Sequence, residues 1–104
     1  MELTLESGAV IRDATEQDLR GRIEGEEFAI LAADEDTYLQ CARQNDAPSE
    51  YVLEFQEGDL GHHYRAVDDA VAVDRVITTF IKYLRGDESW KSDFTWQRIE
   101  LQAR

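Results

Sequence analysis

The stretch that decides the fold reads EYVLEFQ at residues 50–56, HHYRAV at residues 62–67 and VDRVITTFIKYLRG at residues 73–86. In the first run, side chains at every second position are apolar, which is typical of a strand with one buried face. A turn at Gly58 returns the chain into the second run, which predicts an adjacent strand. The third run repeats apolar residues at helical spacing and ends at Gly86, so it predicts an amphipathic helix closed by a left-handed glycine cap.

Upstream of this stretch the sequence predicts a short helix and further strands. Residues 2–11 alternate imperfectly and predict one short edge strand, or two with a turn between them. Thr15 begins a capping-box pattern with Asp18, which predicts a helix of two to three turns. The apolar run FAILAA at residues 28–33 predicts a strand buried on both faces, and residues 37–43 alternate as its antiparallel neighbour.

These elements predict an α+β fold in a single domain over residues 1–104. We expect an antiparallel sheet of about four to five strands, with the short helix near the N-terminus and the amphipathic C-terminal helix packed on one face. Consecutive strand-like runs joined by short loops favour a meander. Residues 96–101 predict a last short strand. Three aromatic residues after the helix are expected to pack as core: Trp90, Phe94 and Trp96.

The net charge of −12 is the most unusual bulk property of the chain. Residues 1–74 carry 19 acidic and 5 basic residues, whereas residues 75–104 carry 4 and 6. Because nucleic acids and anionic membranes are bound through lysine and arginine, this composition argues against both as partners. It favours a basic protein partner, although acidity also serves solubility alone. The single Cys41 indicates a reducing compartment, so we expect a cytoplasmic protein.

Residues that often carry catalytic or metal-binding chemistry form no recognisable pattern. Neighbouring side chains on a strand point to opposite faces, so His62 and His63 are expected to be surface or strand-edge residues, not a shared metal site. Cys41 is expected to be a buried apolar side chain rather than a nucleophile. The sequence therefore predicts no enzyme, no cofactor and no metal.

Acidic residues gather in three predicted turns. Carboxylates perform acid–base or metal chemistry only in a cleft that shifts their pKa values, and the sequence indicates none. The turns are either solvated surface or the contact surface for a protein partner. The candidate contact residues are Glu24, Glu26 and Glu27 after the first helix, Asp34, Glu35 and Asp36 in the first hairpin, and Glu57 and Asp59 in the central turn.

A second basis for predicting the function is a pattern of apolar positions over roughly residues 27–97. Its defining positions are Val73 and Asp74 entering the helix, Ile77 and Phe80 within it, Gly86 after it, the FTW run at residues 94–96, and the strand pair at residues 51–56 and 62–67. This pattern resembles small immunity proteins of bacterial polymorphic toxin systems, often encoded beside deaminase-type and nuclease toxins. The segment at residues 87–93 departs from that group, being longer and without proline. The resemblance implies inhibition of a cognate toxin by tight stoichiometric binding.

Two functions remain open from the sequence. The first is an immunity-type protein that neutralises a toxin, a basic one being the candidate, through its acidic turns. The second is a structural or adaptor module that binds itself or another protein through a strand edge. Both a monomer and a homodimer are compatible with the sequence.

Overall fold

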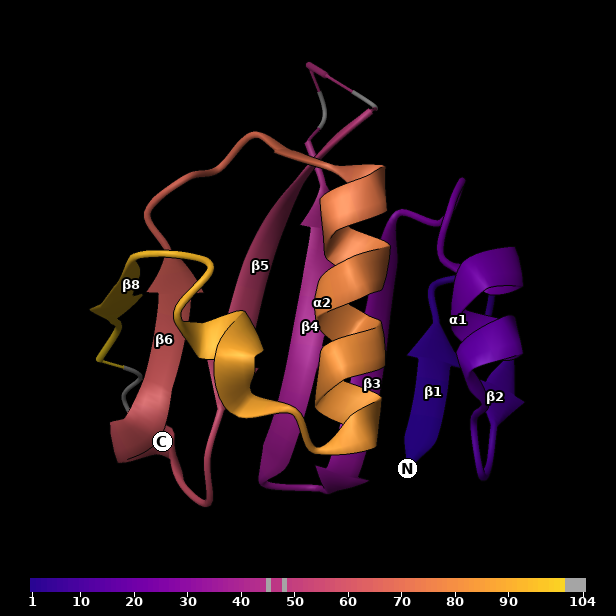
Figure 1. Cartoon of the computed structure of the whole chain (residues 1–104), viewed down its shortest axis with the longest axis horizontal. Coiled ribbons are helices and arrows are strands. Elements are labelled where there is room, and N and C mark those ends of the chain that lie inside the picture. Colours follow the sequence, from indigo (N-terminus) through magenta and orange to yellow (C-terminus); the bar gives the residue numbers. More distant parts are fainter. Residues whose placement is uncertain (45, 48, 101–104) are drawn as a thin grey trace.

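The structure is a computed structural model that describes residues 1–44, 46–47 and 49–100. It confirms the α+β class (Figure 1). The elements are β1 (Glu2–Leu5), β2 (Val10–Ile11), α1 (Glu16–Arg22), β3 (Phe28–Asp34), β4 (Thr37–Arg43), β5 (Glu50–Gln56), a 3-10 turn (Leu60–His62), β6 (His63–Ala66), β7 (Val71–Ala72), α2 (Val73–Arg85), a second 3-10 turn (Glu88–Lys91) and β8 (Trp96–Arg98).

All strands join one sheet in the order β2-β1-β3-β4-β5-β6-β8, and β7 pairs with β5 beside this path. Every pairing is antiparallel, and the predicted meander from β3 to β6 is confirmed. Within the described residues the sheet has eight strands rather than the expected four to five. Three of these strands are very short: β2 and β7 have two residues each, and β8 has three. Both edges of the sheet, β2 and β8, are therefore formed by very short strands, which limits pairing with another chain.

The ends of the two helices form as the sequence predicts. At the start of α1, the Thr15 hydroxyl accepts from the Asp18 backbone N–H, and the Asp18 carboxylate accepts from the Thr15 backbone N–H at 2.8 Å. This capping box satisfies N–H groups that have no partner within the helix. At the end of α2, Gly86 adopts a φ of 74°. Its N–H and that of Asp87 donate to the carbonyls of Tyr83 and Lys82, so the last turn is closed.

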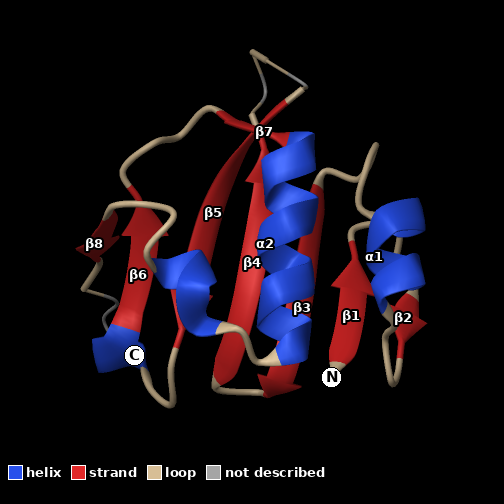
Figure 2. Ribbon diagram, viewed as in Figure 1, coloured by secondary structure: helices blue, strands red, loops and turns tan. Residues whose placement is uncertain are grey.

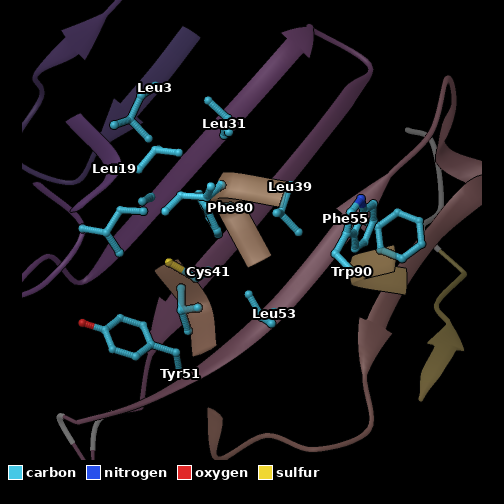
Figure 3. Close-up of a cluster of buried hydrophobic side chains, with 14 of the residues drawn as sticks. Leu3, Leu19, Leu31, Leu39, Cys41, Tyr51, Leu53, Phe55, Phe80 and Trp90 are labelled. Atoms are coloured by element: carbon cyan, nitrogen blue, oxygen red, sulfur yellow. The ribbon is translucent and has the colours of Figure 1, made fainter. Parts of the chain in front are cut away.

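Both helices lie on the same face of the sheet, with α2 running along its central strands and α1 at the end formed by β1 and β2 (Figure 2). The core fills the space between this face and the helices, and Phe80 of α2 lies among side chains from the central strands (Figure 3). The side chains of β3 alternate between this core and the opposite face of the sheet. Ala29 and Leu31 are fully buried in the core, whereas Phe28 on the opposite face is 36% exposed. The expected burial of β3 on both faces is therefore wrong. Among the described residues, no helix is long and apolar enough to cross a membrane.

The segment after α2 closes one corner of the core around Phe55 of β5. The rings of Trp90 and Trp96 meet the Phe55 ring edge-on, at centroid distances of 4.9 and 4.8 Å, and Tyr64 stacks on it at 4.9 Å. Trp90 is 4% exposed, which confirms it as core, while Phe94 and Trp96 are half-buried against the same cluster. The predicted last strand is present as β8, and Leu101 lies outside the described residues.

Candidate functional site

The meander separates the predicted contact residues into two groups at opposite ends of the sheet. Successive antiparallel strands reverse direction, so the β3–β4 and β5–β6 connections lie at one end, and the segment before β3 lies at the other (Figure 1). The hairpin carboxylates and the central turn therefore share an end. The residues brought together are Asp34, Glu35, Asp36, Glu57 and Asp59, and the residues placed at the far end are Glu24, Glu26 and Glu27.

Hydrogen bonds join the two acidic turns that share an end. The Gly58 N–H donates to the carbonyl of Asp36 at 3.1 Å and also lies 3.1 Å from the Thr37 hydroxyl. The Gln56 side-chain amide donates to the same Asp36 carbonyl at 3.1 Å. Within the hairpin, the Asp34 carboxylate accepts from the Asp36 N–H at 2.8 Å. Residues twenty positions apart in sequence are thereby held as one surface.

Two hollows adjoin this surface, and both are lined in part by Met1 and Ala33. One, of about 480 Å³, lies between the N-terminus and the β3–β4 hairpin. The other, of about 410 Å³, lies between that hairpin, the central turn and the end of α2, where Tyr83 and Trp90 supply aromatic walls. We call this region the acidic end. It is defined by eight carboxylates, Glu2, Asp13, Asp34, Glu35, Asp36, Glu57, Asp59 and Glu88, and two cations, Arg12 and Lys91.

Some charged side chains at the acidic end already form ion pairs or hydrogen bonds with other residues of the chain. The Lys91 ammonium lies 2.6 Å from Glu57 and 2.8 Å from Glu88. Burial opposes the charge on Lys91, but the hydrogen bonds to these two carboxylates outweigh it and raise the pKa of Lys91. The Asp59 carboxylate caps the following 3-10 turn and lies 2.8 Å from His62 Nδ1, and this His62 contact is the main cause that lowers the pKa of Asp59.

The hairpin carboxylates are more open. Asp34, Glu35 and Asp36 are all exposed, and they stand at the tip of the β3–β4 hairpin between the two hollows. At the far end of the sheet, by contrast, Glu26 accepts from the Ser7 hydroxyl at 3.2 Å and Glu27 lies 3.9 Å from Arg43. Neither hollow of the acidic end touches that group, so the hairpin is the better candidate for partner contact.

The two adjacent histidines occupy different environments, which the sequence did not indicate. The 3-10 turn removes His62 from the strand and leaves it exposed. His63 opens β6 and is only 3% exposed, so the expectation of a surface or strand-edge residue is wrong for His63. Its ring reaches two neighbours on β5, with Nε2 at 2.6 Å from the Glu54 carboxylate and Nδ1 at 3.1 Å from the Gln56 side-chain oxygen.

The orientation of the Gln56 side-chain amide determines which of its atoms faces the buried His63 ring. Its amide NH₂ donates to the Asp36 carbonyl, so its oxygen faces His63 and the Tyr38 hydroxyl, which donates at 3.2 Å. Both nitrogens of the His63 ring therefore lie within hydrogen-bond distance of oxygen atoms that can act as acceptors. These hydrogen bonds connect the β3–β4 hairpin to β5 and β6, and they help to hold the acidic end in place.

Other candidate chemistry is buried or dispersed. Cys41 is 1% exposed within the core (Figure 3), and burial raises the pKa of its thiol to about 12. The reactive thiolate is thus disfavoured at neutral pH. Among residues 1–44, 46–47 and 49–100, no three His, Cys, Asp or Glu side chains are grouped to hold a metal ion.

Comparisons with known proteins add no relative. No family model matches the chain, and neither the curated proteins nor the solved structures gave a match.

Proposed function

We propose that this chain is a protein-binding module whose acidic end docks a basic partner protein. The observation that carries the proposal is the joining of two acidic turns, by the bonds of Gly58 and Gln56 to the Asp36 carbonyl, beside two hollows. An ordered backbone presents carboxylates in fixed positions, so a partner does not have to order them on binding. The hollows offer room for side chains that project from the partner.

The electrostatics of the acidic end suit a cationic partner. Eight carboxylates against two cations create a negative field that steers a basic surface and raises its association rate at low salt. The partly exposed Tyr83 ring in the second hollow suits the apolar stem of an arginine or lysine from the partner. Arginine and aromatic anchors of this kind dominate many protein interfaces.

The resemblance to immunity proteins supplies the class of partner in this proposal. A toxin that acts on nucleic acid needs a basic surface to hold its substrate, and an acidic module that occupies this surface excludes the substrate. The module binds the toxin in the cytoplasm of the cell that makes it, and neutralises it by occupying its basic cleft without performing a reaction.

Neutralising the hairpin tests the proposal against a matched control. The variant Asp34→Asn/Glu35→Gln/Asp36→Asn removes three charges but keeps an oxygen at position 34 to accept from the backbone of residue 36. The control, Glu24→Gln/Glu26→Gln/Glu27→Gln, removes three charges at the far end. Wild-type protein is used to capture a partner from the native host, and association rates are then measured for all three proteins at several salt concentrations.

The expected result is a slower association and a flatter salt dependence for the hairpin variant, with the control close to wild type. Equal effects of the two variants would show that only net charge matters and would refute docking at the acidic end. For the toxin class, cells that express the captured partner alone should stop growing, and co-expression of the wild-type chain should restore growth. A captured partner that is acidic, or harmless when expressed, contradicts the neutralisation.

A further inference from the structure

The buried contacts of His63 lead to the backbone that joins the two acidic turns. The side chains of His63 and Gln56 are each 3% exposed. From the His63 ring the contacts pass through the Gln56 side chain to the Asp36 carbonyl, which also accepts from the Gly58 N–H. A change of protonation at the ring can therefore reach the hydrogen bonds that order the acidic end.

Two protons on the pair formed by His63 and Glu54 satisfy all of these contacts. One proton lies on Nδ1, which then donates to the Gln56 oxygen at 3.1 Å. The second lies in the 2.6 Å contact between Nε2 and the Glu54 carboxylate, and it belongs to the pair whichever of the two atoms carries it. The Gln56 NH₂ is then free to donate to the Asp36 carbonyl at 3.1 Å.

A pair that holds only one proton cannot satisfy the same contacts. With that proton between Nε2 and the carboxylate, the lone pair of Nδ1 faces the Gln56 oxygen across 3.1 Å, and no hydrogen lies between these two acceptors. Turning the Gln56 amide over brings its NH₂ to Nδ1, but its oxygen then faces the Asp36 carbonyl. In either orientation one buried polar contact is lost, which is costly where water does not replace it.

Tyr38 is the titratable group that reaches the pair from β4. Its hydroxyl donates to the Gln56 oxygen at 3.2 Å, and its ring meets the His63 ring edge-on at a centroid distance of 6.1 Å. Burial, followed by the charges of Glu54 and Asp36, raises the pKa of Tyr38 above its ordinary value. The hydroxyl therefore keeps its proton and remains a donor near neutral pH.

The neighbours from β6 and from the segment after β8 do not change their charge in this range. Arg65 of β6 lies opposite Glu54 in the strand register, is exposed and stays protonated. The Ile99 N–H donates to the His63 carbonyl at 2.8 Å. His62 is exposed and takes no part in these contacts. Because histidine is the side chain that ordinarily changes charge between about pH 5 and 8, a change within this group falls on the pair.

We propose that the His63–Glu54 pair is a pH-sensitive link, which orders the acidic end while it holds two protons and loosens it after it releases one to solvent. At lower pH, the Asp36 carbonyl accepts from both Gln56 and Gly58. At higher pH, the contact through Gln56 is broken and Gly58 remains as the donor. The link is a property of the fold. Its consequence, that a partner docks more firmly at lower pH, rests on the proposed function.

An NMR titration of the full chain from about pH 5.5 to about pH 9 tests the link. Long-range ¹H–¹⁵N spectra distinguish a ring nitrogen that carries a proton from one that does not. The chain has two histidines, so His62→Ala leaves the ring signals of His63 alone. The side-chain NH₂ of Gln56 and the ¹³C signal of the Asp36 carbonyl report the hydrogen bond between them.

As the pH rises, one ring nitrogen of His63 should lose its proton in a single step, and the Gln56 and Asp36 signals should move with the same midpoint. Glu54→Gln should shift this step to lower pH, because no carboxylate then favours the second proton. In Gln56→Leu the ring should still titrate while the Asp36 carbonyl signal stays constant, because the connecting side chain is gone.

Two results would overturn the link. The first is a His63 ring that keeps one protonation state throughout the titration. The second is a step at His63 that leaves the Gln56 and Asp36 signals unchanged. Because these spectra need no partner, either failure leaves the proposed docking to be decided by its own hairpin and control variants.

Discussion

At the scale of single residues, His62 and His63 show how position decides the role of identical side chains. His63 is buried between Glu54 and Gln56, and His62 is exposed beside Asp59. Replacing His63 by alanine leaves the Gln56 oxygen and the Glu54 carboxylate without the ring. We expect the free energy of unfolding to fall by about 1–3 kcal/mol, because the variant loses two hydrogen bonds of a buried ring, one of them to a charged carboxylate.

Urea denaturation followed by circular dichroism measures this change, and His62→Ala is the matched control. Because His62 is exposed, its replacement should change the free energy of unfolding by less than about 0.5 kcal/mol. If the two variants are equally stable, the buried network adds nothing to the fold.

Two buried acids of the core predict a loss of stability at alkaline pH. Burial raises the pKa of the Cys41 thiol from 9.0 to about 12. Burial, together with the carboxylates of Glu57 and Asp34, raises the pKa of Tyr83 from 10.0 to about 12. Both groups lose their protons more easily in the unfolded chain. Their contribution to the free energy of unfolding is therefore complete below the pKa values of the unfolded chain, and it is lost as the pH rises from about 9 towards about 12.

The free energy of unfolding, measured at a series of pH values from 7 upward, checks this expectation. Cys41→Ala should flatten the early part of the decline, and Tyr83→Phe should flatten the part above about pH 10. If the free energy of unfolding falls with pH as steeply in both variants as in the wild type, other groups cause the decline.

At the scale of elements, two glycines of the helices predict opposite effects of the same substitution. Gly86 ends α2 at a φ of 74°, where an alanine is strained even though no atom lies within 4 Å of its Cβ position. Gly86→Ala should therefore cost about 1 kcal/mol. Gly21 lies within α1 with open space around it, so Gly21→Ala should stabilise the fold by about 0.5–1 kcal/mol. Thermal unfolding of the two variants measures both signs, and the same sign for both would contradict the backbone explanation.

The longer elements could be predicted from sequence because each carries its own periodic signal. The alternation in β5 and the helical spacing in α2 extend over two or more repeats. β2 and β7 cannot show such a repeat, because two residues do not establish alternation. Their strand geometry depends on pairing with β1 and β5, so the local sequence left β2 as one of two alternatives for residues 2–11 and gave no sign of β7. The prediction that residues 28–33 are buried on both faces failed for a different reason. Phe28 and Ile30 are apolar, although no helix covers the face on which they lie.

At the scale of the whole molecule, the meander alone separates the acidic turns into two ends. Alternating strand direction already implies that the β3–β4 and β5–β6 turns share an end, and this much of the site follows from the predicted strands. The hollows could not be predicted, because they depend on Met1 and Tyr83, which meet the hairpin only through long-range packing. The His63 network likewise requires the register that places Gln56 opposite both Tyr38 and His63.

The closing of the core around Phe55 also determines how the protein can be observed by fluorescence. Both tryptophans of the chain, Trp90 and Trp96, belong to this one cluster, with ring centroids 5.7 Å apart. Every tyrosine lies at residue 38 or beyond, so β1, β2, α1 and β3 contain no intrinsic fluorophore except phenylalanine. Tryptophan emission therefore reports the C-terminal corner alone, and the N-terminal third of the sheet could detach without changing the environment of either tryptophan.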